Sequence, residues 1–176
     1  MNTLAQIIPK LPETYPLPVM IVQHRLHDAN EYLVEHLRNL CDLQVKTAES
    51  RAAIQAPCVY IAPSGYHLLV ERDRSFSLSI DPKVNYAIPS IDVLFETAAD
   101  AYQEKRVGVI LTGANCDDCR GLESIKKYGG LSIVQDPATA ASSYMPSAAI
   151  NIAEVDHIIP LNEIGIFLKS IANWSQ

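Results

Sequence analysis

The sequence has little positive charge, little cysteine and no long apolar run, and each shortage excludes a class of protein. Fourteen lysines and arginines stand against 20 aspartates and glutamates, giving a net charge of −6 without a block of like charge. A surface that tracks nucleic-acid phosphates is therefore not expected. No apolar run approaches the ~18 residues of a bilayer span, and prolines interrupt the N-terminal stretch where a signal peptide would be continuous. We expect a cytoplasmic protein without membrane insertion.

Four cysteines in 176 residues are too few for a disulfide framework. They are Cys41, Cys58, Cys116 and Cys119. Because the cytoplasm keeps cysteines reduced, we interpret all four as free thiols.

The sequence is instead rich in apolar residues, at 48%, and these form short runs that alternate with amphipathic stretches of helical length. Such alternation is typical of βαβ units around a parallel sheet with helices on both faces. We predict an α/β fold with a doubly wound, mostly parallel sheet, in one domain over residues 1–176. Two neighbouring runs joined by a charged turn predict one antiparallel hairpin.

Strands are expected at residues 19–23, 43–47, 58–62, 67–70, 76–80, 107–111, 131–135 and 158–159. Asp28 is expected to cap a helix whose apolar face carries Tyr32, Leu33, Leu37 and Leu40, and Ser90 is expected to cap a second helix. Two more helices are expected, one over 118–128 that ends at Gly129-Gly130 and one over 161–174. A small-residue stretch surrounds Pro146, and we find no repeat or linker.

Ligands and catalysis in doubly wound sheets gather where loops leave the carboxyl ends of the strands. This rule selects His24, which follows the first strand, the loop 112–119, and the pair Gln135-Asp136. An imidazole at such a place suits a general base at neutral pH, and a solvated loop histidine is the alternative. Asp117 suits a carboxylate that orients an imidazole, although a carboxylate before a helix is usually a cap.

Other polar groups admit ordinary explanations. Cys116 and Cys119 have the spacing of a redox pair or half a zinc site, but no second Cys or His pair completes a site, and flanking aspartates raise a thiol pKa. Serines at 64, 142 and 143 are nucleophile candidates in positions common for turn serines. Turn chemistry explains Asn85, Gln135, Asp136 and Thr139. Nucleophile-elbow, dinucleotide and P-loop motifs are absent from the sequence.

Seven segments in collinear order carry a family resemblance. They are PVMIVQH at 18–24, VYIAPSGYHLLV at 59–70, PSIDVLF at 89–95, VGVILTG at 107–113, the aspartate loop ending in Gly121-Leu122, IVQDPAT at 133–139 and MPSAAI at 145–150. Together they resemble the catalytic domain of the CheB-type protein-glutamate methylesterases, the chemotaxis receptor methylesterases.

The resemblance implies hydrolysis of glutamate methyl esters on chemoreceptors, often with glutamine deamidation, by a serine, a histidine and an aspartate. No cofactor or metal is implied. The family's histidine corresponds to His24 and its aspartate to Asp117, while backbone N–H groups near Ala114 correspond to the oxyanion loop. His24 would act as the base and Asp117 would hold its tautomer.

The family's nucleophile lies in a Gly-Ala-Ser-x-Gly-Gly-type turn ahead of the first helix, and residues 1–5 resemble the interior of that helix. We therefore expect this chain to lack the serine and its strand, leaving an incomplete triad, open sheet edges and a tendency to form homo-oligomers. We also expect no receiver domain ahead of the catalytic segment, and hence no control by phosphorelay within the chain.

The site loop also departs from the family pattern. Ala114 replaces a methionine, Asn115 and Asp118 replace glycines, residues 86–88 replace a basic stretch, and Tyr144 replaces a glycine. Three readings remain. The chain is an esterase whose serine lies upstream, as His24 and Asp117 favour, or a binding or regulatory domain without catalysis, as the altered loop favours. The third reading is a thiol or metal protein that uses Cys116 and Cys119.

Overall fold

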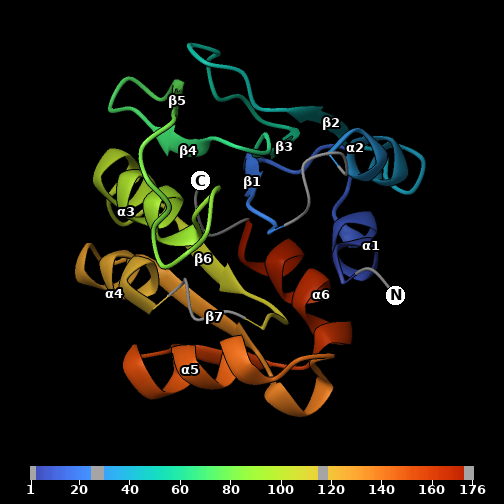
Figure 1. The fold of residues 1–176 in the computed structure, drawn as a ribbon. Helices are drawn as coiled ribbons and strands as arrows, with labels where there is room; N and C mark the ends of the chain where they lie inside the picture. Colours follow the sequence, from blue (N-terminus) through green and yellow to red (C-terminus); the bar gives the residue numbers. More distant parts are fainter. Residues whose placement is uncertain (1–2, 25–29, 115–118, 173–176) are drawn as a thin grey trace.

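The computed structural model describes residues 3–24, 30–114 and 119–172 (Figure 1). Three strands near the N-terminus form a parallel sheet in the order β1-β3-β2. These are β1 (Val19–Ile21), β2 (Gln44–Thr47) and β3 (Cys58–Ile61). A second parallel sheet, in the order β6-β7-β8, contains β6 (Val107–Ile110), β7 (Leu131–Gln135) and β8 (His157–Ile159).

One antiparallel pair joins the two halves along the chain. It consists of β4 (His67–Val70) and β5 (Phe76–Ser79), with His67 opposite Ser79 and Val70 opposite Phe76. The predicted α/β class, with mostly parallel strands and one hairpin, is confirmed.

Helices connect the strands. They are α1 (Leu4–Ile7), α2 (Asn30–Arg38), α3 (Ile91–Tyr102), α4 (Cys119–Lys127), α5 (Tyr144–Ile152) and α6 (Leu161–Ile171), with 3₁₀ turns η1 (Ile8–Lys10) and η3 (Pro137–Thr139). Among the described residues, no helix combines the length and apolar character that crossing a bilayer requires.

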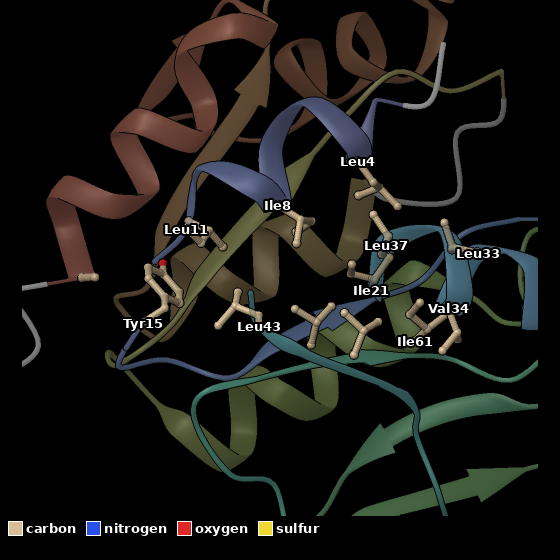
Figure 2. Close-up of a cluster of buried hydrophobic side chains, with 13 residues drawn as sticks. Leu4, Ile8, Leu11, Tyr15, Ile21, Leu33, Val34, Leu37, Leu43 and Ile61 are labelled. Carbon is tan, nitrogen blue, oxygen red and sulfur yellow. The ribbon is translucent and has the colours of Figure 1, made fainter. Parts of the chain in front are cut away.

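Side chains of β3 alternate between two apolar clusters, because successive strand residues point to opposite faces. Val59 and Ile61 join a cluster with residues of α1, η1 and α2, which Figure 2 shows from Leu4 and Ile8 to Leu33 and Leu37. Tyr60 points the other way, into a cluster with the hairpin and α3. Helices therefore cover both faces of this sheet, as predicted.

The second sheet is covered in the same way. Ile133 of β7 packs in a cluster with Ile7 of α1 and with Ile164 and Ile171 of α6. The next residue, Val134, packs in a cluster with residues of α4 and α5. Both residues are fully buried, so β7 is a central strand with helices on each side.

The carboxyl ends of β1 and β6 lie against shared cores. Val22, directly after β1, packs against the cluster that contains Ile110, the last residue of β6. Leu111, directly after β6, packs against the cluster that contains Ile21, the last residue of β1. Within the described residues, β1 and β6 each pair with a strand on one side only, so two open sheet edges lie at this boundary.

Some helix predictions were wrong. Helix α2 ends at Arg38, so Leu40 lies beyond it and is 42% exposed, and Tyr32 faces solvent. Around Pro146, where the sequence indicates only a stretch of small residues, the chain forms α5. A proline in the first helical turn removes no intrahelical hydrogen bond, because the N–H groups there have no helical partner. The predicted cap at Ser90 is confirmed, since its hydroxyl accepts from the N–H of Val93, whereas Asp28 lies outside the described residues.

Candidate active site

Two predicted site residues lie on loops that leave β1 and β6. His24 follows β1 by three residues and is exposed. Ala114 follows β6 by four residues and is exposed as well. Because the ends of the two strands share apolar contacts through Val22 and Leu111, both loops begin at the same boundary between the sheets. An imidazole and an exposed loop residue are thus placed after the carboxyl ends of two strands that share apolar contacts, where doubly wound folds hold ligands.

The loop after β6 is fixed by a buried amide. Gln135, the last residue of β7, is 0% exposed. Its Oε1 accepts a hydrogen bond from the backbone N–H of Thr112 at 2.9 Å, and its Nε2 donates to the carbonyl of Thr139 at 3.0 Å. One side chain therefore ties the loops that follow β6 and β7 to each other.

A second set of bonds holds the same loop against the start of α5. The Thr112 hydroxyl donates to the carbonyl of Ser142 at 3.1 Å and accepts from the Ser142 N–H at 2.8 Å. The carbonyl of Gly113 accepts from the Ser142 hydroxyl at 3.0 Å and from the N–H of Met145 at 3.0 Å. Ser142 is thereby engaged as a structural residue of the loop.

Gly113 has no room for a side chain. A Cβ at this position would lie 2.3 Å from Sδ and 3.1 Å from Cβ of Met145. Since Met145 is buried, a side chain at 113 would force the methionine to move, and glycine lets the loop approach α5 without that shift. Loop and helix therefore form a rigid support for the backbone at Ala114, which suits N–H groups that must be aimed before a reaction begins.

The remaining predicted residues are distributed as follows. Asp117 and Cys116 lie outside the described residues, and Cys119 is the first residue of α4. Ser64 lies in a turn before Gly65, and Ser143 is exposed just before α5. The described residues contain no cluster of three or more His, Cys, Asp or Glu side chains that could hold a metal ion. Burial raises the pKa of the Cys41 and Cys58 thiols, which disfavours the reactive thiolate at these two positions.

Turn chemistry explains some, but not all, of the polar residues for which the sequence predicts it. Asp136 accepts from the N–H of Ala138, and Thr139 donates to the carbonyl of Asp136, as predicted for a turn. Gln135 instead belongs to the buried network described above. Asn85 lies in the turn between Val84 and Ala87 with a φ of 48°, as predicted for a turn residue, and its side chain also donates to the carboxylate of Asp92. The strand-end rule selected Gln135 as a site candidate, but its interpretation as a turn residue was wrong, because its buried amide ties the loops after β6 and β7 together.

The chain is similar to proteins of one family. A family model described as CheB methylesterase matches residues 1–168. A Leptospira interrogans protein with the provisional name protein-glutamate methylesterase/protein-glutamine glutaminase is 46% identical over 169 residues, covering 96% of this chain and 88% of the relative. A Carboxydothermus hydrogenoformans protein-glutamate methylesterase/protein-glutamine glutaminase is 37% identical over 166 residues, covering 92% of this chain and 49% of the relative. The crystal structure of the Thermotoga maritima CheB methylesterase catalytic domain superposes with a TM-score of 0.92 at 32% identity, covering 96% of this chain and 91% of the other.

Proposed function

This chain belongs to the CheB methylesterase family, and we propose that it hydrolyses methyl esters of glutamate side chains on a methylated chemoreceptor. One observation carries the proposal. A histidine and a rigidly supported backbone loop leave neighbouring strand ends at one boundary, in a chain that matches the family model over residues 1–168. The activity class is that of a carboxylic ester hydrolase, and the proposed compartment is the cytoplasm.

Each retained group has a defined task in this reaction. His24 takes the proton from a serine hydroxyl as its oxygen attacks the ester carbonyl carbon. Backbone N–H groups near Ala114 stabilise the oxyanion of the tetrahedral intermediate. Asp117 keeps the imidazole in the tautomer whose Nε2 faces the serine. Its role rests on the family similarity, because Asp117 lies outside the described residues.

Collapse of the intermediate breaks the bond to the methoxy oxygen, and His24 returns the proton to it, so methanol leaves. Water then attacks the acyl-serine with His24 again as base, which regenerates the serine and releases the glutamate carboxylate. The same steps on a glutamine side chain release ammonia, and we include this deamidation in the proposal because relatives carry both activities in their names.

We assign the nucleophile to a serine on a further parallel strand that pairs with the open edges of β1 and β6, carried by polypeptide outside the described residues. Two observations support this assignment. Both edges are unpaired on the facing side within the described residues. In addition, Oε1 of Gln23, next to His24, is buried without a hydrogen-bond partner in the described part of the chain. Leaving such an acceptor unsatisfied costs about 1–3 kcal/mol, so a neighbouring segment that donates to it is favoured.

Product analysis tests the activity. The protein as its own cell makes it is incubated with a methylated chemoreceptor, and methanol and the receptor glutamates are quantified. We expect one methanol for each glutamate carboxylate formed from a methyl ester, and one ammonia for each glutamate carboxylate formed from a glutamine. Absence of methanol above the protein-free control would overturn the esterase proposal and favour a binding role for the domain.

A further inference from the structure

A shallow hollow lies beside α5. It is open to solvent, has a volume of about 580 Å³, and is lined by the segment 141–143 and by one face of the helix. That face carries Tyr144, Ser147, Ala148 and Asn151, whose spacing of three and four residues places their side chains on the same side of a helix. The described residues of the lining offer hydroxyl groups, an amide and an aromatic ring, and none of them is charged.

The hollow is continuous with the loop that follows β6. Ser142, in its wall, donates from its hydroxyl to the carbonyl of Gly113 at 3.0 Å. Met145, the residue after Tyr144 in α5, donates from its N–H to the same carbonyl at 3.0 Å. Because Ala114 directly follows Gly113, these two bonds hold the proposed oxyanion loop against the hollow. A protein bound at the loop therefore lies within reach of the hollow.

Tyr144 presents its ring from a fixed part of this surface. The side chain is 58% exposed, whereas the next two residues, Met145 and Pro146, are buried. A ring so exposed contributes little packing to the fold, but it offers a large contact area to a partner and loses little conformational freedom on binding. Such a ring beside the proposed oxyanion loop suits a residue that binds the substrate next to its reacting group.

The polar part of the lining matches uncharged groups. Ser143 stands directly before α5, and its side chain makes no capping hydrogen bond to the helix. The side chains of Ser143, Ser147 and Asn151 both donate and accept hydrogen bonds, so they complement an amide or a hydroxyl of a partner. A carboxylate in the same place would lose its hydration without gaining a cation from the described lining. The lining therefore fits neutral polar side chains better than acidic ones.

We propose that this hollow is a substrate subsite of the esterase, which binds the chemoreceptor segment next to the esterified glutamate and favours a segment with uncharged side chains. The inference rests on the proposed function and names the substrate class of that site. The ring of Tyr144 packs against the segment, and the serine and asparagine side chains bind its polar groups. The subsite determines affinity for the receptor, while the bonds are broken and formed at the ester.

The kinetics of methanol release from a methylated chemoreceptor, by the protein as its own cell makes it, test the subsite. Tyr144→Ala removes the ring, and we expect KM to rise about fivefold while kcat changes less, because the contact is made equally in the ground state and the transition state. Tyr144→Phe keeps the ring and should raise KM less than Tyr144→Ala. Thermal unfolding verifies that each variant is folded.

Ile152→Ala is the matched control. Ile152 is the last residue of the same helix, is 53% exposed and lies outside the lining. Its truncation removes an apolar side chain of similar exposure, so it should leave both KM and kcat at their wild-type values.

Two competing peptides test the class of ligand. Each carries one glutamate methyl ester, flanked on both sides by glutamines in one peptide and by glutamates in the other. We expect the glutamine-flanked peptide to inhibit methanol release from an isotope-labelled receptor about tenfold more strongly. Asn151→Trp fills the hollow from an exposed position and should reduce this difference to about twofold or less.

The outcomes distinguish this inference from the proposed function. If the wild-type protein releases no methanol from the receptor, the proposed function itself fails. If the wild type is active and a folded Tyr144→Ala variant keeps the wild-type KM, the subsite is overturned. Equal inhibition by the two peptides, or inhibition by neither, would overturn the uncharged class of the ligand.

Discussion

The backbone N–H of Thr112 donates to Oε1 of Gln135 over 2.9 Å, in a place where Gln135 is completely buried. This bond joins the loops that leave two adjacent parallel strands, β6 and β7. Leaving one end of a buried amide without a hydrogen bond is costly, because the unpaired group has lost its contact with water and gains no partner in return. The site loop is therefore held by the protein interior rather than by contacts at its surface.

Replacing Gln135 should impair both stability and turnover. Gln135→Leu leaves the Thr112 N–H and the Thr139 carbonyl without their partner, so we expect a loss of about 1–3 kcal/mol in the free energy of unfolding. Methanol release should fall through kcat more than through KM, because the loop supports the oxyanion. Urea unfolding and steady-state kinetics measure the two effects. Unchanged kcat in a destabilised variant would contradict the assigned role.

Gly113 and Met145 should be energetically coupled. Gly113→Ala places a methyl group 2.3 Å from Sδ of Met145, and overpacking of this kind costs about 1–3 kcal/mol. Met145→Ala alone should destabilise by about 2–5 kcal/mol through the cavity it leaves. The double variant should cost less than the two single changes together, and a double-mutant cycle from denaturant unfolding measures the difference. Strict additivity would show that the two residues do not share this space.

Tyr86 occupies a strained turn. The N–H of Val84 donates to the carbonyl of Ala87, and the N–H of Ala87 donates to the carbonyl of Val84. The two residues between them, Asn85 and Tyr86, have φ of 48° and 69°. Tyr86 is 94% exposed, so its ring gains little from packing. Tyr86→Gly should raise the free energy of unfolding by about 1 kcal/mol, because left-handed backbone costs an L side chain about that amount. Tyr86→Ala is the control, since it removes the ring but keeps the strain, and an equal gain there would refute this explanation.

Asp156 should make stability fall in acid. Burial raises the pKa of its carboxyl, but hydrogen bonds from Lys126 and Ser132 together lower the pKa by more than burial raises it. The pKa therefore lies below its ordinary value. A carboxyl whose pKa is lower in the folded protein stabilises the fold at pH values above the pKa of the unfolded chain, about 3.9. This stabilisation is lost as the pH falls through the pKa of the folded protein. Urea unfolding from pH 5 to pH 3 should therefore show a smaller loss for Asp156→Asn than for wild type. Parallel curves would contradict the prediction.

The sequence predicted those parts of the fold that depend on local pattern. Apolar runs bounded by turn residues located the central strands, and Ser90 was recognised as a helix cap because its chemistry is local. Helix α5 was missed because its small residues carry no amphipathic period and Pro146 argues against a helix unless its place in the first turn is known.

The site divides in the same way. The strand-end rule brought His24 and Asp117 forward as candidates, the family resemblance gave them their roles, and both assignments stay predictions. The strand-end rule marked Gln135 as a candidate, but its role depends on a partner 23 residues away along the chain, Thr112. No periodicity or spacing encodes a contact over that separation, so this partner was visible only once the loops were placed.

The most direct test of the proposed active site is the rate of methanol release from a methylated chemoreceptor by wild type and His24→Ala, both prepared as the native cell makes the protein. His36→Ala, which changes a histidine on α2, is the matched control. If His24 is the base, its loss should lower kcat by about 10³-fold or more, while His36→Ala keeps the wild-type rate. A His24→Ala protein that releases methanol at the wild-type rate would contradict the proposal.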